Sequence, residues 1–135
     1  MTSATGYTFA ITVGGSVAEV RPRVEAALKA EGFGVITEID VQATMRTKLG
    51  TERAPYLILG ACNPPLANRA IEADPSIGVL LPCNVVLREE DDETIVEAMN
   101  PMAALGIVGG EAVRAVAEEA TACLERAMAT LAEPG

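Results

Sequence analysis

The chain of 135 residues is long enough for one domain of ordinary size, and 50% hydrophobic against 21% charged residues excludes a disordered chain, a coiled coil and a collagen-like repeat. The sequence contains no His, which excludes Ser-His-Asp triads, Cys-His pairs and His-ligated metal centres. A net charge of −9 argues against nucleic acid as a partner, because nucleic-acid affinity rests mainly on Lys and Arg.

The first half of the chain alternates predicted strands with predicted helices. Apolar side chains at every second position predict a strand that ends at Gly14, and Ser16 with Glu19 forms a capping box that starts a helix. That helix ends at Gly32, since Gly is a typical C-terminal stop. The predicted elements of this half are a strand in 7–13, a helix between 16 and 32, a strand in 33–39, a short helix between 40 and 50 and a strand in 56–61.

The second half begins with a helix that Asn63 caps and ends with an amphipathic helix. Between them a long apolar run is interrupted by Pro82, so we expect a strand that lies at an edge or bulges there. The predicted elements of this half are a helix from 63 to about 73, a strand in 77–88, an acidic turn in 89–93, a hairpin partner in 94–99, a short helical turn in 100–106 and a helix in 111–131.

The element order β-α-β-α-β-α-β-β-α predicts an α+β fold. Because this order combines crossovers with one hairpin, we expect a mixed β-sheet with the helices packed mainly on one face. The sequence shows no linker, no low-complexity segment and no long repeat, so residues 1–135 are interpreted as a single domain.

The sequence favours a soluble, cytoplasmic protein with no membrane partner. The longest apolar stretch, 77–87, is about half of the roughly 20 residues that a membrane helix needs. The basic residues form no dense cluster that would recruit a membrane, and residues 1–10 lack the features of a secretory signal. Three cysteines, an odd number, fit a reducing compartment better than a disulfide scaffold.

Three short motifs stand out from the rest of the sequence. GACNP occupies 60–64, LLPCNV occupies 80–85 and NPM occupies 100–102, so that the dipeptide Cys-Asn occurs twice. Together these motifs closely resemble the domain-of-unknown-function 302 family, and the resemblance covers roughly residues 9–131. It implies an α+β sandwich and a tendency to form homodimers, but no established biochemical activity.

The cysteines are candidates either for chemistry or for packing. Cys62 precedes the N-cap of a predicted helix, where backbone N–H groups and the helix dipole favour a thiolate. If their strands pair, Cys62 and Cys83 could meet, which would permit a reversible disulfide or a two-thiolate site for a soft metal such as Cu(I). Free Cys is also among the most buried residue types, so these two and Cys123 can instead be core residues. Two sulfurs without His make a poor zinc site, and we expect no metal or cofactor.

Three asparagines could orient an uncharged polar ligand, because an amide both donates and accepts hydrogen bonds. Asn63 and Asn100 precede prolines and also fit helix caps. Asn84 lies in an apolar strand where its amide must find partners, so it is the best pointer to a polar network or pocket. The candidate ligand-binding residues are Cys62, Asn63, Cys83, Asn84, Asn100 and Met102.

Two further segments favour structural interpretations. The five consecutive acids in 89–93 could bind Ca²⁺, but they lack the spacing and the glycine of an EF-hand loop and are interpreted as a solvated turn. The Gly-rich segment 106–110 resembles a phosphate-binding loop only weakly, because it lacks the lysine of a P-loop. It is interpreted as a flexible lead-in to the last helix.

Two classes of function are carried forward, and a purely structural partner protein is a third alternative that the sequence leaves open. The preferred hypothesis is a non-catalytic homodimer that binds or senses a small-molecule ligand near the two Cys-Asn segments. The alternative is a thiol-dependent redox or sulfur-handling protein in which Cys62 reacts and Cys83 resolves the product. A positive mean hydropathy in so small a domain supports the homodimer, because some apolar surface should remain for a partner.

Overall fold

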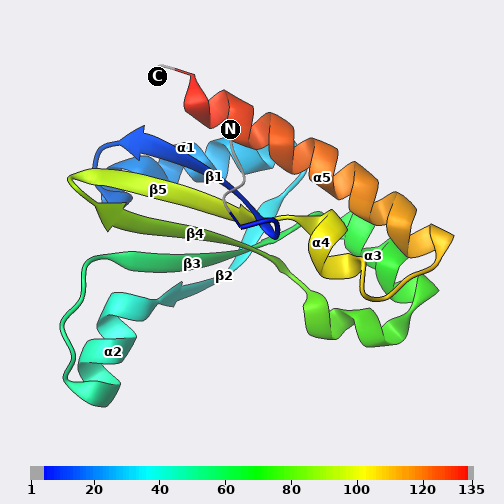
Figure 1. The fold of residues 1–135 in the computed structure, drawn as a ribbon, viewed down its shortest axis with the longest axis horizontal. Helices are drawn as coiled ribbons and strands as arrows, with labels where there is room; N and C mark the ends of the chain where they lie inside the picture. The colour runs from blue at the N-terminus through cyan, green and yellow to red at the C-terminus, as the bar shows by residue number, and fades with distance from the viewer. Residues whose placement is uncertain (1–4, 134–135) are drawn as a thin grey trace.

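In the computed structural model, which describes residues 5–133, five strands form one sheet (Figure 1). The strands are β1 (Thr8–Gly14), β2 (Gly34–Asp40), β3 (Tyr56–Cys62), β4 (Cys83–Glu90) and β5 (Glu93–Met99). The helices are α1 (Val17–Ala30), α2 (Val41–Leu49), α3 (Pro64–Ala73), the 3-10 helix η1 (Pro75–Leu80), α4 (Pro101–Leu105) and α5 (Glu111–Ala132). The predicted α+β class and element order are confirmed, with η1 as an addition.

The sheet has the strand order β1-β5-β4-β3-β2, and every neighbouring pair is antiparallel. The prediction of a mixed sheet is therefore wrong. That prediction treated the helices between strands as crossovers. Instead, α2 joins the neighbours β2 and β3, and α3 with η1 joins the neighbours β3 and β4, so these helices turn back at the ends of the sheet (Figure 1). Only α1 carries the chain from one edge strand, β1, to the other, β2.

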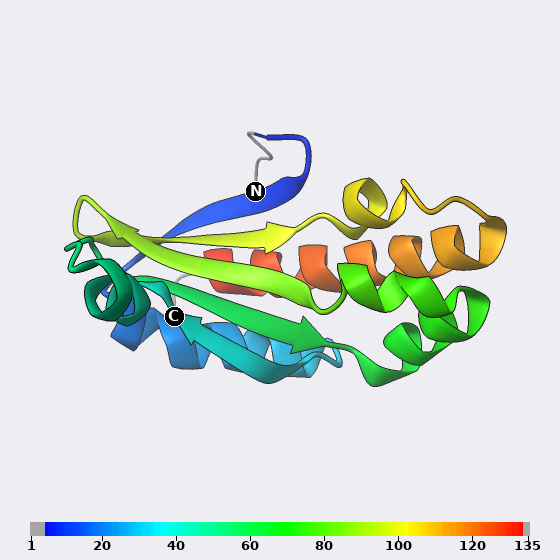
Figure 2. The same ribbon diagram turned by 90° about the horizontal axis from the view of Figure 1, so that it is seen from below.

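The helices α1 and α5 cover one face of the sheet, and Figure 2 shows both on the same side of it. Successive side chains of a strand point to opposite faces. Leu59 and Val85 point toward the helices and are buried, whereas Ile58 and Val86 point to the other face and are half-buried. We call this second face the open face of the sheet. The prediction that helices pack mainly on one face is confirmed.

The start of α1 is capped by its own residues and is joined to the sheet by two further hydrogen bonds. The predicted capping box forms, with the Ser16 side chain accepting from the Glu19 N–H and the Glu19 carboxylate accepting from the Ser16 N–H. The Glu89 carboxylate accepts from the Val17 N–H at 2.8 Å, and the buried Thr94 hydroxyl donates to the Gly15 carbonyl at 2.9 Å. The acidic run is thus not only a solvated turn, because Glu89 stabilises the N-terminus of α1.

The predicted strand in 77–88 divides into a helix and a shorter strand. Asp74 caps η1 by accepting from the Ser76 N–H at 3.0 Å, and β4 begins only at Cys83. Pro82 therefore precedes the strand and needs no place at an edge or in a bulge. The physical reason is that proline has no N–H to contribute to the strand ladder.

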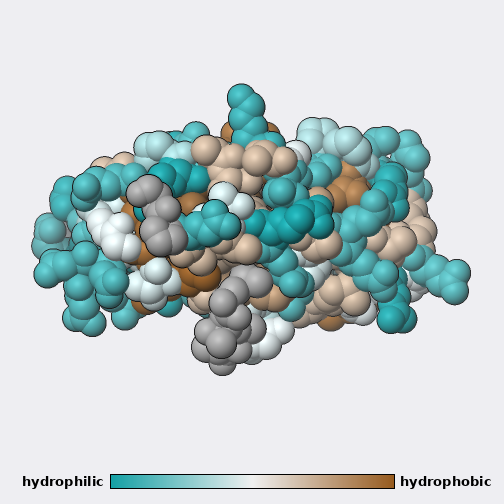
Figure 3. All heavy atoms as spheres, turned by 90° about the horizontal axis from the view of Figure 1, so that it is seen from above, coloured by the Kyte–Doolittle hydropathy of each residue, from teal (hydrophilic) through white to brown (hydrophobic). Residues whose placement is uncertain are grey.

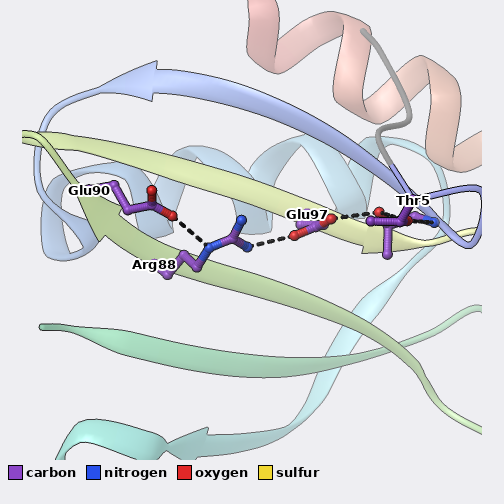
Figure 4. Close-up of polar contacts among 5 residues, drawn as sticks. Thr5, Arg88, Glu90 and Glu97 are labelled. Carbon is purple, nitrogen blue, oxygen red and sulfur yellow. Dashed lines mark hydrogen bonds and ion pairs between the residues drawn. The ribbon is translucent and has the colours of Figure 1, made fainter. Parts of the chain in front are cut away.

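An ion-pair network lies across the open face (Figure 4). Arg88 donates to Glu97 at 2.6 Å and to Glu90 at 3.1 Å, and the Thr8 hydroxyl donates to the other oxygen of Glu97 at 2.5 Å. The hydrogen bond from Thr8 first, and then the hydrogen bond and the positive charge of Arg88, lower the pKa of Glu97. The network joins β1, β4 and β5. Seen from above, the surface of the molecule is a mosaic of hydrophilic and hydrophobic residues (Figure 3).

The two-residue loop of the β4–β5 hairpin yields a prediction about stability. Asp91 and Asp92 have φ of +53° and +64°, a conformation that favours Asn and Gly. We expect Asp91→Asn with Asp92→Gly to stabilise the protein by about 1 kcal/mol, because the loop strain is relieved. Thermal denaturation measures the change. The control Asp91→Ala with Asp92→Ala removes the same charges but keeps the strain, and a gain as large as that of the Asn-Gly variant would contradict the explanation.

Candidate functional site

The antiparallel pairing of β3 and β4 brings the two Cys-Asn segments to one end of the sheet. Cys62 is the last residue of β3 and Cys83 is the first of β4, with Ala61 directly opposite Cys83. The strand predicted in 77–88 would place Cys83 inside a strand, whereas β4 begins at this residue. The condition on which a meeting of the two cysteines depended, the pairing of their strands, is therefore present.

A cavity of about 310 Å³ opens at this end of the sheet, and both thiols line it. One wall is the sheet end, with Ala61 next to the two cysteines. The opposite walls come from α3, from η1 and the residues after it, and from α4 and α5, which all lie at this end of the molecule (Figure 1). The main lining side chains from these helices are Leu66, Ala67, Ala70, Leu105, Val116 and Ala120.

The mouth of the cavity is marked by two isoleucines that line it and are also exposed to solvent. Ile36 of β2 is 61% exposed and Ile71 of α3 is 43% exposed. Leu105 and Val116 line the same cavity and are buried, and we call the buried part of the lining, which also includes Ala70 and Cys83, its deep end. The cavity therefore leads from an apolar rim into an apolar interior.

The backbone of β3 passes close to its neighbours beside the cavity, which explains the glycine of the GACNP motif. A Cβ atom at Gly60 would overlap the Thr37 hydroxyl and would lie 2.8 Å from Cγ of Pro82. Gly60 thus lets side chains from β2 and from the LLPCNV motif cross over β3. The two motifs are linked by this close approach.

The three cysteines are free and differ in environment. Cys83 is buried, and burial, with a smaller contribution from Cys62, raises the pKa of its thiol from about 9 to about 11. Cys62 is half-buried at the sheet end. Cys123 of α5 is also half-buried, whereas a core residue would be fully buried. It accepts a hydrogen bond from Arg126 at 3.3 Å.

Two of the candidate asparagines act as helix caps. Asn63 lines the cavity, but its side-chain oxygen accepts from the Leu66 N–H at 3.3 Å and its nitrogen donates to the Glu31 carbonyl at 3.5 Å. Asn100 caps α4 by accepting from the Met102 N–H at 3.0 Å. Both amides are therefore used in holding helix ends in place.

Asn84 and Met102 do not join the cysteines at the cavity. Asn84 points to the open face, opposite Gly60, and is exposed. The prediction that its amide belongs to a buried network is wrong, because the strand alternation turns it away from the core. Met102 is half-buried and lines a shallow groove beside α5, apart from the cavity.

Several lining residues carried no signal that would assign them to a site. Leu66 and Ala70 lie on the apolar face of α3, which reads in sequence as ordinary core packing. Gly78 lies in η1 and Leu81 follows it, but the prediction of a strand in 77–88 left no place for this helix. The signal that could have revealed η1 is Asp74-Pro75-Ser76, a cap followed by a proline in the first turn.

Among residues 5–133, no group of three or more Cys, Asp or Glu side chains is arranged to hold a metal ion. In the same part of the chain, no helix combines the length and the hydrophobicity needed to cross a bilayer.

The comparisons with known proteins agree on one family. The sequence pattern of the Domain of unknown function DUF302 matches residues 9–131. The chain belongs to the DUF302 family. A crystal structure of an uncharacterized conserved DUF302 protein from Bacillus stearothermophilus is similar to this chain, with 28% identity, a TM-score of 0.82, and coverage of 94% of this chain and 97% of that chain. No curated protein matches the sequence.

The raised pKa of Cys83 predicts a specific loss of stability at high pH. The folded state holds the thiol proton more tightly than the unfolded state, so the associated stability is present below pH 9 and is lost as pH rises toward 11. We expect the difference in unfolding free energy between the parent and Cys83→Ala to shrink over this range by on the order of 2 kcal/mol. Urea denaturation from pH 7 to 11 measures it. A difference that does not change with pH would contradict the burial of this thiol.

Proposed function

We propose that this DUF302 protein is a non-catalytic binding module for a small apolar ligand, held in the cavity where Cys62 and Cys83 meet. The observation that carries the proposal is the apolar lining of this cavity, which has a volume of about 310 Å³ and opens to solvent beside Ile36 and Ile71. Small-molecule sites are typically concave and lined mainly by apolar side chains. An apolar opening at the convergence of two sequence motifs therefore supports a ligand site.

The lining supports binding through shape more than through polar contacts. Most of the lining side chains are aliphatic, and Asn63, which also lines the cavity, uses its amide as a cap. Ligand pockets are typically apolar with a few polar groups that set orientation. Here the thiols of Cys62 and Cys83 are the weak polar groups that remain.

Among the described residues that line the site, none has a side chain suited to act as a general base toward a nucleophile. The sequence has no His to act as a general base, and burial keeps the Cys83 thiol protonated at neutral pH by raising its pKa to about 11. A thiolate rather than a thiol is the reactive form. These features favour binding over catalysis.

The binding proposal predicts uptake of toluene, a compact apolar probe. We expect toluene to shift the methyl NMR signals of Val116 and Leu105, and Ala67→Leu to weaken binding at least about tenfold by filling the cavity. The matched control is Ala73→Leu on the same helix, because Ala73 is exposed and does not line the cavity. The proposal fails if toluene shifts no lining methyl, or if both variants bind it as the parent does.

A thiol-dependent function is the second candidate, and it rests on the two free cysteines that line one cavity. The binding proposal predicts that Cys62 alkylates at the rate of an ordinary thiol and that buried Cys83 alkylates more slowly. Single-cysteine variants, labelled over a range of pH and located by mass spectrometry, give the rates. Fast reaction of Cys62 below about pH 7 would instead favour redox or sulfur-handling chemistry.

We also propose that the protein assembles as a homodimer in the cytoplasm. The open face supports the homodimer, because it carries the half-buried Ile58, Val86 and Ile95 and lies opposite the face that α1 and α5 cover. Free cysteines support a reducing compartment.

The dimer proposal predicts that a charge at the centre of the open face disrupts association. We expect Val86→Lys to be monomeric in light scattering at concentrations where the parent is a dimer, because pairing would bury the added charges. Val79→Lys is the control, since Val79 is 89% exposed on η1 and lies off the sheet. A parent that is monomeric at high micromolar concentration would contradict the homodimer.

A further inference from the structure

We propose that the ligand is an amphiphile, with a single apolar tail that fills the cavity and an uncharged polar head that stays in water at the Ile36–Ile71 mouth. This inference rests on the proposed binding function and adds the chemical class of the ligand and its direction of entry. Four features of the described residues support it.

Among the described residues, the buried lining offers a ligand hydroxyl no strong hydrogen-bonding side chain. It consists mainly of apolar side chains, including Leu105 and Val116, and the Cys83 thiol is only a weak polar group. The Asn63 amide, the polar side chain best suited to pair with a ligand, already contacts Leu66 and Glu31. A hydroxyl carried to the deep end would lose its water without a replacement, which is unfavourable. The buried end of the ligand must therefore be apolar.

The mouth continues the apolar lining out to the solvent. Ile36 and Ile71 line the cavity while 61% and 43% exposed, and Val79, next to the lining residue Gly78, is 89% exposed. Large apolar side chains around an opening gain from contact with an apolar chain that passes between them. A ligand wholly enclosed in the cavity would leave this rim unused.

The size of the cavity sets the length of the tail. An apolar cavity of about 150 Å³ takes up benzene, which has six carbon atoms. By proportion, the present cavity of about 310 Å³ holds about twelve non-hydrogen atoms. A tail of about eight to twelve carbons fits this space.

The charge of the protein favours an uncharged head. None of the described residues that line the cavity is Lys or Arg, so no cation there is placed to meet an anionic head. On the same helix as Ile71, Arg69 is already paired with Glu119 of α5. The net charge of −9 adds a general repulsion of anions, which salt weakens.

The decisive experiment compares two isomers of one ligand on the unmodified protein. Octane-1,2-diol carries both hydroxyls at one end, whereas octane-1,8-diol carries one at each end and must bury a hydroxyl to insert its chain. We expect octane-1,2-diol to bind at least about tenfold more tightly, measured by NMR titration. Equal affinity, or tighter binding of the 1,8-isomer, would overturn the inference.

The orientation is read directly from the same complex. The terminal methyl group of octane-1,2-diol should show nuclear Overhauser contacts to Leu105 and Val116, and its hydroxyl-bearing carbons should show contacts to Ile71. The reverse pattern would overturn the inference even if the affinities agree with it.

Octanoate should bind more weakly than octane-1,2-diol at low salt, and equally tight binding would refute the uncharged head.

Two substitutions test whether the ligand passes the mouth at Ile71. Ile71→Gln should weaken octane-1,2-diol several-fold by removing apolar contact at the rim. Leu49→Gln, at a position 71% exposed on α2 at the other end of the molecule, should leave affinity unchanged (Figure 1). Equal effects of the two substitutions would contradict a mouth at Ile71. If toluene binds but neither diol does, the amphiphile inference fails and the binding function stands, whereas failure of all three probes removes both.

Discussion

Burial of one face of the antiparallel sheet beneath α1 and α5 is the constraint on which the rest of the structure depends. Leu59, Leu87 and Leu124 are completely buried there, and each such side chain contributes about 1.5–3 kcal/mol. Because side chains alternate along a strand, fixing the covered face also decides which residues point away from it. The ion pair of Arg88 and Glu97 lies on the open face for this reason.

The cavity follows from how the strands are connected. Since β3 and β4 are antiparallel neighbours, α3 and η1 turn back at the end of the sheet instead of crossing one of its faces. There they meet α4 and α5 across small side chains, with Ala67, Ala70 and Ala120 in the lining. Small residues at facing positions leave space that larger ones would fill. The site therefore results from connectivity and side-chain size together.

The motif residues divide between holding the site and lining it. Gly60 allows Thr37 and Pro82 to approach, and Asn63 fixes the start of α3, so both shape the cavity walls. Cys62 and Cys83 line the space, and the burial that places Cys83 there also keeps its thiol protonated by raising its pKa. The packing of Cys83 and the low reactivity expected of its thiol therefore have the same cause.

The sequence by itself determined the features that depend on neighbouring residues: the Ser16–Glu19 capping box, the Asn63 and Asn100 caps, the hairpin around the acidic turn and the apolar stripe of α5. It also determined the family through short motifs. Only the tertiary structure decided the antiparallel direction of every strand pair, the exposure of Asn84, the contact of Glu89 with α1 and the cavity. Caps and turns are set by interactions within about four residues, whereas these features depend on pairings between distant segments, such as Ala61 with Cys83, which local patterns do not specify.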